Sequence, residues 1–354
     1  MKKARIICMS LIAFGFAFLA TSCNKDNDTK NDTLTITAAT FEVEDGDRMY
    51  IDFEIRKTLW NAYDEVMVYN VDLDHPGASI TSVFSTDASA EGQYVAHFSG
   101  SPLGPKKDKF YFFYPASMAS GELNNNHETF TVGNEQHYTM MTSASGNPMA
   151  TVEPGAIAQA TSSDNLDFQM QHIFGCARFL LTGPGRTVDH IVLEDKQLQL
   201  TGECTLSIPA VTEHFADLGI YIDNYRRGRI SYVEMYNYLK GVLDYSSNPN
   251  GRVITLDCSS YSYAGTTYNG VELNKNNSNN PEVFVIGLRP AALSMGWTLT
   301  VYFTDNTYVV VDDTDIDDVD EPLEFCIRPG KWKNIEPPTL NTFNYPADRW
   351  GTWE

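Results

Sequence analysis

An acidic cluster near the C-terminus has the residue types and the spacing that could bind a metal ion. Five of its carboxylates repeat the ligand spacing of a calcium-binding loop, in which oxygen atoms converge on one cation: Asp313, Asp315, Asp317, Glu321 and Glu324. The loop position at which the chain turns sharply is normally glycine, but here it is Asp318. The spacing indicates a calcium site, whereas the missing glycine favours a solvated acidic loop between two strands.

The sequence lacks the common motifs of catalysis. It contains no Gly-x-Ser-x-Gly, no His-Glu-x-x-His, no Walker loop and no Gly-x-Gly-x-x-Gly. Its 7 histidines are scattered singly along the chain. Its 46 acidic residues offer many pairs to a glycosidase, which remains the catalytic alternative because only geometry could select a pair. We therefore expect a protein that is not an enzyme and that uses no cofactor.

The composition describes a folded and strongly acidic chain. Of 354 residues, 42% are hydrophobic and 12% are aromatic, which is enough to build hydrophobic cores. The chain has 25 Lys and Arg against 46 Asp and Glu, and its net charge of -21 would repel a phosphate backbone. We therefore expect no nucleic acid among its partners.

Residues 1–22 have the pattern of a signal peptide, because basic residues precede an apolar run from Ile6 to Ala20. Small residues then stand directly before Cys23, and this order resembles the bacterial lipoprotein signal. In that signal the cysteine carries acyl chains such as palmitate and becomes the mature N-terminus. We therefore expect a lipid on Cys23 that holds the protein on a membrane. An ordinary signal peptide with a chance cysteine is the alternative.

Residues 23–33 are polar and predict a flexible tether after the lipidated cysteine. Their Lys-Asp-Asn-Asp segment resembles the surface-export signal of lipoproteins in one large phylum of Gram-negative anaerobes. This resemblance implies a surface-exposed lipoprotein of the outer membrane.

Four cysteines remain once Cys8 leaves with the signal peptide and Cys23 takes the lipid: Cys176, Cys204, Cys258 and Cys326. Four cysteines in an exported protein allow three pairings, among which the sequence does not choose. Buried thiols that form no disulfide are the alternative.

From Leu34 onward, apolar and polar residues alternate with period two, which is typical of antiparallel strands. Five consecutive aromatic residues, Phe110–Tyr114, must face both ways, so they predict an inner strand covered on both sides. The helical candidate is Ile230–Leu243. We predict an all-β protein with two Greek-key β-sandwiches in tandem, residues 34–166 and 167–335, followed by a tail of residues 336–354.

Several segments together resemble fimbrillins, the subunits of lipoprotein-derived pili. Leu59–Tyr69 is similar to their Trp-x-x-x-Asp-x-Ile-x-Val-Tyr stretch, Tyr111–Ala116 to their aromatic strand ending in Tyr-Pro, and His172–Phe179 to the first strand of their second domain. Three further segments follow in the expected order: Phe284–Pro290, Trp297–Phe303 and Pro329–Trp332. The resemblance covers about residues 34–335.

This resemblance implies two transthyretin-like sandwiches and assembly outside the cell with other pilin subunits by β-strand addition. In stalk subunits of the family, an arginine-specific protease removes the first strand, and a strand of the next subunit fills the groove. The matching residue here is Arg48, in the polar loop after the strand Leu34–Phe41. An uncut loop arginine is the alternative, because anchor and tip subunits need not be processed.

The tail carries apolar side chains that must be buried somewhere: Leu340, Phe343, Tyr345, Trp350 and Trp353. They predict either a donor strand for a neighbouring subunit or a segment packed on its own domain.

These observations together favour a fimbrillin-like pilus subunit or pilus-associated adhesin, exported as a lipoprotein and bound to a host or bacterial surface receptor. The alternative is a glycan-binding surface lipoprotein of a carbohydrate uptake system. An exposed coplanar row of tyrosines, such as Tyr261, Tyr263 and Tyr268, would favour that alternative.

Overall fold

Strands dominate the part of the chain that the structure describes. The computed structural model describes residues 34–40, 59–143, 145–153, 156, 158–183, 185–208, 215–245, 251–273, 281–292, 296–312, 326–327, 332–335 and 340. These residues form several β-sheets and two α-helices, so the prediction of a mostly β protein is confirmed. Among these residues, no helix combines the length and the apolar character that crossing a bilayer requires.

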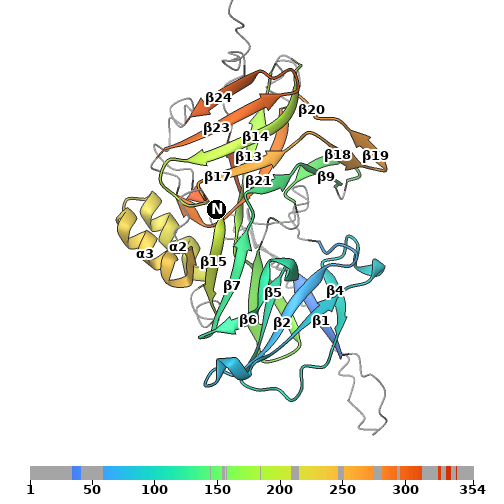
Figure 1. Cartoon of the computed structure of the whole chain (residues 1–354), viewed down its shortest axis with the longest axis vertical. Coiled ribbons are helices and arrows are strands. Elements are labelled where there is room, and N and C mark those ends of the chain that lie inside the picture. The colour runs from blue at the N-terminus through green and yellow to red at the C-terminus, as the bar shows by residue number, and fades with distance from the viewer. Residues whose placement is uncertain are drawn as a thin grey trace, which may run out of the picture. The chain divides into compact units, whose positions relative to one another are not determined.

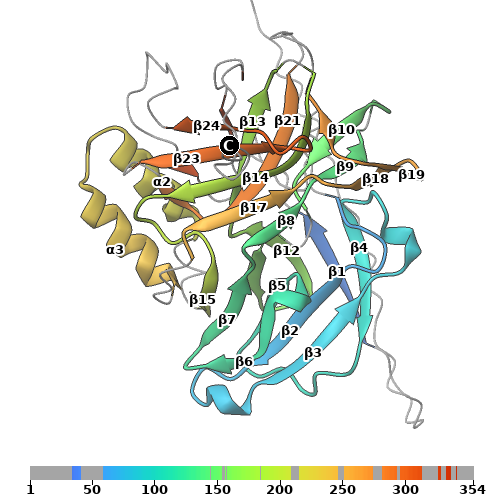
Figure 2. The ribbon, with the colours of Figure 1, turned by 45° about the horizontal axis from the view of Figure 1, so that its top comes forward.

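Seven strands, from the residues predicted to form the first sandwich and the start of the second, close into a barrel (Figure 1 and Figure 2). Their order around the barrel is β1 (Leu34–Thr40), β12 (Asp167–His172), β11 (Gln159–Ser163), β5 (Lys109–Tyr114), β2 (Glu65–Val71), β3 (Ile80–Ser85) and β4 (Val95–Gly100). Neighbouring strands are antiparallel except β1 and β12, which run parallel. Three short 3-10 helices lie between strands of this part of the chain: η1 (Pro76–Ala78), η2 (Ala88–Ala90) and η3 (Ala116–Met118).

The aromatic strand β5 is covered on both sides, as its five consecutive rings predict. Phe110, Phe112 and Tyr114 belong to the core inside the barrel. Tyr111 and Phe113 belong to a second and larger core outside it. Because successive side chains of a strand point to opposite faces, this one strand joins the two cores.

The larger core lies among three further sheets. The first has the order β16 (Leu243–Tyr245), β15 (Gly202–Ser207), β7 (His127–Val132) and β6 (Ala119–Asn124). The second has the order β21 (Glu282–Leu288), β13 (Gly175–Leu181) and β26 (Trp332–Ile335). The third runs β24 (Tyr308–Asp312), β23 (Trp297–Phe303), β14 (Thr187–Asp195), β17 (Val253–Asp257) and β8 (Glu135–His137), and β20 (Val271–Glu272) also pairs with β14.

Three two-stranded sheets complete the described strands. They are β9 (Thr139–Thr142) with β10 (Pro148–Thr151), β18 (Tyr261–Tyr263) with β19 (Thr266–Tyr268), and β22 (Ala291–Ala292) with β25 (Cys326–Ile327). The domain boundary predicted between residues 166 and 167 stays a prediction, and strand pairing crosses that position in both directions. The later strand β12 pairs with β1, and the earlier strands β7 and β8 pair with β15 and β17.

The two helices are α2 (Phe215–Arg226) and α3 (Tyr232–Val242). The predicted helix at 230–243 is α3, and its start is fixed by a capping box in which Ser231 and Glu234 exchange hydrogen bonds. Its buried side chains are Met235, Leu239 and Val242. The sequence did not predict α2, whose buried residues Leu218 and Ile222 are four positions apart on one face.

Candidate strand-exchange site

Strand β1 is an inner strand of the barrel, with both of its edges paired. On one side it runs antiparallel to β4, in a register from Leu34 opposite Gly100 to Ala39 opposite Val95. On the other side it runs parallel to β12, in a register from Thr37 opposite Asp167 to Thr40 opposite Met170. Removal of β1 would therefore leave two facing rows of unpaired backbone groups, on β4 and on β12.

The inward side of β1 is apolar and fully buried. Ile36 is 1% exposed and Ala38 is 0% exposed, whereas Thr37 between them is half-buried and Thr35 before them is exposed. Ile36 lies opposite Phe98, and Ala38 lies opposite both Ala96 and Phe168. A slot left by β1 would therefore have an apolar floor as well as two open edges.

Among the described side chains of β1, which are those of residues 34–38, Thr37 makes a polar contact with a neighbouring strand. The hydroxyl of Thr37 lies 3.3 Å from the Nδ1 atom of His97 on β4, at an exposed position. The pairing rests mainly on backbone hydrogen bonds and apolar burial, which any strand with alternating apolar residues can supply. Strand addition requires an exposed sheet edge, and the edges of β4 and β12 would be exposed only after β1 had left.

The Trp-x-x-x-Asp motif of the sequence, Trp60 to Asp64, packs against the same barrel core. Trp60 is 2% exposed, and its ring meets Phe98 edge-on at 5.0 Å and Tyr114 edge-on at 5.4 Å between centroids. Asp64 accepts a hydrogen bond from the Tyr114 hydroxyl at 3.0 Å and another from the Asn61 amide at 2.8 Å. Burial raises the pKa of Asp64, and these two hydrogen bonds oppose part of that rise. Trp60 therefore packs against Phe98, which lies opposite Ile36 of β1.

Most of the site residues predicted from sequence lie outside the described residues. They are Cys23, Arg48, the calcium candidates Asp313, Asp315, Asp317, Glu321 and Glu324, and the tail residues Phe343, Tyr345, Trp350 and Trp353. Arg48 belongs to residues 41–58, which connect β1 to the rest of the barrel. The acidic cluster follows β24 and precedes β25 in the chain.

Leu340 is the one tail residue that the structure describes. It is 2% exposed in the larger core, and its backbone amide donates a hydrogen bond to the Thr182 carbonyl at 2.9 Å. Leu340 therefore packs on the chain's own sheets.

The structure does not select a disulfide pairing among the four cysteines named from the sequence. Cys176 and Cys258 are buried and carry free thiols, and Cys204 is also buried. The side chain of Cys326 lies outside the described part.

The tyrosines that would favour glycan binding do not form a coplanar row. Tyr261 and Tyr268 face each other across the β18–β19 hairpin, with ring centroids 4.9 Å apart and planes 11° from parallel. Each ring therefore covers one face of the other. The Tyr263 hydroxyl lies 3.1 Å from the Thr142 hydroxyl.

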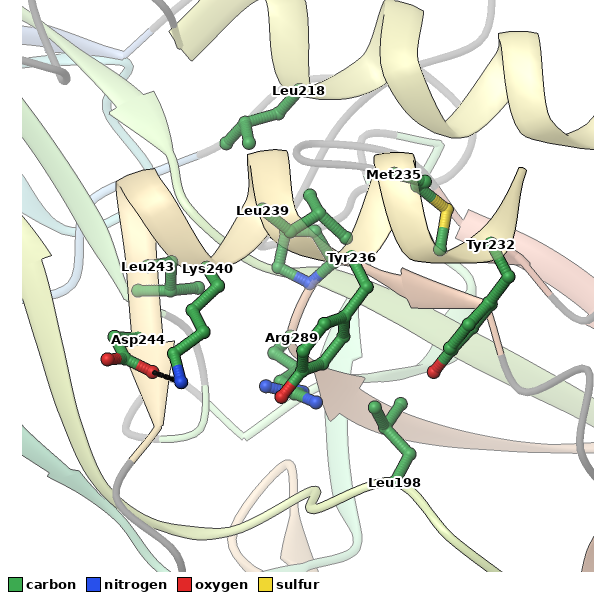
Figure 3. A pocket seen from close by; sticks show the side chains of 11 residues that line it. Leu198, Leu218, Tyr232, Met235, Tyr236, Leu239, Lys240, Leu243, Asp244 and Arg289 are labelled. Atoms are coloured by element: carbon green, nitrogen blue, oxygen red, sulfur yellow. Dashed lines mark ion pairs between the residues drawn. The ribbon is translucent and has the colours of Figure 1, made fainter. Parts of the chain in front are cut away.

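A pocket lies against helix α3 (Figure 3). Its lining includes four leucines, the rings of Tyr232 and Tyr236, and Arg289. Lys240 and Asp244, which also line the pocket, form an ion pair at 3.7 Å. The lining contains no serine, cysteine or histidine, so it offers no nucleophile paired with a histidine base.

Comparison with known proteins gives neighbours among solved structures only. No family model matches the sequence, and no curated protein matches it. A cell adhesion protein from Bacteroides ovatus is 11% identical, with a TM-score of 0.41 over 89% of this chain and 97% of that one. The tip fimbrial protein Mfa3 from Porphyromonas gingivalis is 9% identical, with a TM-score of 0.34 over 88% of this chain and 99% of that one.

A fimbrial protein from Bacteroides ovatus is 13% identical, with a TM-score of 0.29 over 85% of this chain and 50% of that one. These neighbours are cell adhesion and fimbrial proteins, the same kind of protein that the sequence resembles.

Proposed function

We propose that this protein is a fimbrial subunit or cell-surface adhesin that assembles by exchanging its first strand for a strand of another subunit. The observation that carries the proposal is the position of β1 between β4 and β12, with both edges paired and its apolar side buried. Replacing β1 with an equivalent strand restores the same hydrogen bonds and the same apolar contacts. The role is structural and requires no catalysis.

The chain connectivity fits release of β1 by one proteolytic cut. Residues 41–58, which include Arg48, are the covalent link between β1 and the strands that follow it. Cleavage after Arg48 would leave β1 held only by non-covalent contacts. Because Cys23 precedes β1, the same cut would also separate the lipid anchor from the remaining barrel. Processing and release from the outer membrane would then be a single event.

Mass spectrometry of the protein taken from its native cell surface tests this proposal. We expect two forms, one with a lipid on Cys23 and one that begins at Met49 and migrates in polymers. Replacement Arg48→Lys should keep the positive charge but abolish the second form and the polymers, because an arginine-specific protease no longer cuts there. Replacement Arg56→Lys is the matched control and should change neither. Polymers in which every subunit retains β1 would contradict the proposal.

A further inference from the structure

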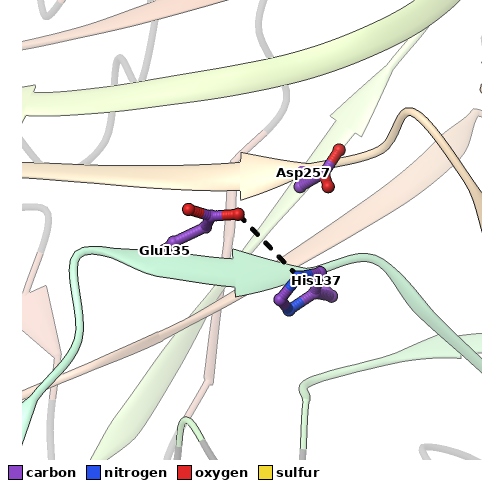
Figure 4. Close-up of side chains that lie close together, drawn as sticks. All are labelled: Glu135, His137 and Asp257. Carbon is purple, nitrogen blue, oxygen red and sulfur yellow. Dashed lines mark ion pairs between the residues drawn. The ribbon is translucent and has the colours of Figure 1, made fainter.

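The edge of the six-stranded sheet gathers three side chains with metal-binding atoms. Glu135 and His137 lie two positions apart on β8 and therefore share one face of that strand. Asp257 on β17 lies directly opposite His137 in the parallel pairing of the two strands. One ligand atom from each of the three lies within 4.8 Å of the others (Figure 4).

The imidazole of His137 is already oriented for a metal ion. Its Nδ1 atom lies 3.1 Å from the carboxylate of Glu153, and that carboxylate also accepts a hydrogen bond from the His137 amide at 2.8 Å. Its Nε2 atom faces Glu135, at 3.8 Å from Oε1. A carboxylate on one ring nitrogen favours a proton there and leaves the other nitrogen as a free ligand.

A hydrogen bond also positions the carboxylate of Asp257. Its Oδ1 atom accepts a hydrogen bond from the Ser259 amide at 2.8 Å, which holds the side chain at the end of β17. The His137 and Glu135 side chains are 55% and 61% exposed, so they can close around an ion from solvent. Zinc–ligand bonds of about 2.0–2.2 Å require only a small inward movement of these atoms.

We propose that Glu135, His137 and Asp257 form a site for a divalent transition-metal ion of the zinc class. One imidazole with two carboxylates suits zinc and its neighbours better than calcium, which prefers six or more oxygen ligands. Solvent water completes the coordination at this exposed edge. Because β8 is the last strand of its sheet, the bound ion ties that edge strand to β17. Glu153 is a positioning residue that orients His137.

Binding to the untagged protein tests the site. Titration calorimetry with zinc should give one equivalent bound, and cobalt should give the visible absorption of a site with nitrogen and oxygen ligands. His137→Gln or Asp257→Asn should remove this equivalent, and Glu153→Gln should weaken zinc binding by about 10- to 100-fold. The matched control is His75→Gln, which removes an exposed histidine 3.4 Å from the single carboxylate of Asp72. This control should leave zinc binding unchanged.

Two results would overturn the proposal. The first is zinc binding that survives both His137→Gln and Asp257→Asn in protein whose circular dichroism shows that it is folded. The second is a cobalt spectrum with thiolate charge-transfer bands, which would place the ion on cysteines instead. Zinc should also raise the melting temperature of the native chain and not that of the His137→Gln variant, because binding to the folded state stabilises it.

Discussion

At the scale of single residues, burial of the Glu128 carboxylate costs folding free energy when the group is ionised. Glu128 on β7 is 0% exposed and lies close to Tyr69, on the outer side of the barrel. One of its oxygens accepts hydrogen bonds from the Ser120 amide at 2.8 Å and from the Ser120 hydroxyl at 3.1 Å. Burial raises the pKa of Glu128 to about 7, although the Tyr69 hydroxyl and Ser120 oppose part of that rise.

This shift predicts that the chain loses stability as the pH rises. Below a pH of about 4.5 the carboxyl is protonated in the folded and unfolded states, so it adds no penalty. Between about 4.5 and 7 the unfolded state ionises first, and the free energy of unfolding falls by an amount on the order of 3 kcal/mol. Glu128→Gln should therefore stabilise the protein at pH 8 but not at pH 4.5.

Denaturant unfolding at the two pH values measures the difference between the wild-type chain and the Glu128→Gln variant. Glu122→Gln, at an exposed position on the neighbouring strand β6, is the control and should change stability little at either pH. A Glu128→Gln effect of equal size at both pH values would show that the buried charge is not its cause.

At the scale of the elements, local pattern predicted strands well and their partners poorly. The alternation of Leu34–Thr40 and the double-sided aromatic run of β5 both depend on neighbours in sequence, and both are confirmed. The parallel pairing of β1 with β12 joins residues far apart in the chain, and no local periodicity encodes it. Helix α2 was missed because Leu218 and Ile222, the buried residues among its described side chains, do not by themselves make a helical period visible.

The same limit explains why the sequence did not reveal the candidate metal ligands. His137 stands on a three-residue strand with no second metal-binding histidine nearby in sequence. Only the pairing of β8 with β17 brings Asp257 beside it.

The exchange of β1 makes a prediction about which of its side chains matter. Ile36→Ala should destabilise the barrel by about 2–4 kcal/mol, because it leaves a cavity against Phe98 and its neighbours. Thr35→Ala, one position away and exposed, should change stability by less than about 0.5 kcal/mol. Equal losses for the two variants in denaturant unfolding would contradict the inward packing of β1.

At the scale of the whole molecule, the tail is the segment that the sequence predicts either to donate a strand to a neighbouring subunit or to pack on its own domain. Leu340 is fixed to Thr182, so any exchange must use residues after it. Residues 341–354 could span roughly 45 Å when extended at about 3.3 Å per residue, whereas β1 has only 7 residues. Phe343 and Tyr345 are two positions apart, as inward-facing residues of a donor strand must be.

Removing residues 341–354 should therefore separate folding from assembly. We expect the shortened chain, which keeps Leu340 in the larger core, to unfold at the same temperature as the full chain. After cleavage at Arg48, the shortened chain should remain monomeric in size-exclusion chromatography while the full chain forms polymers. The double replacement Phe343→Ser and Tyr345→Ser should reproduce this loss of polymers, because it removes the apolar side chains but keeps the backbone. Unchanged polymers from the shortened chain would mean that the strand filling the slot beside β4 and β12 comes from elsewhere.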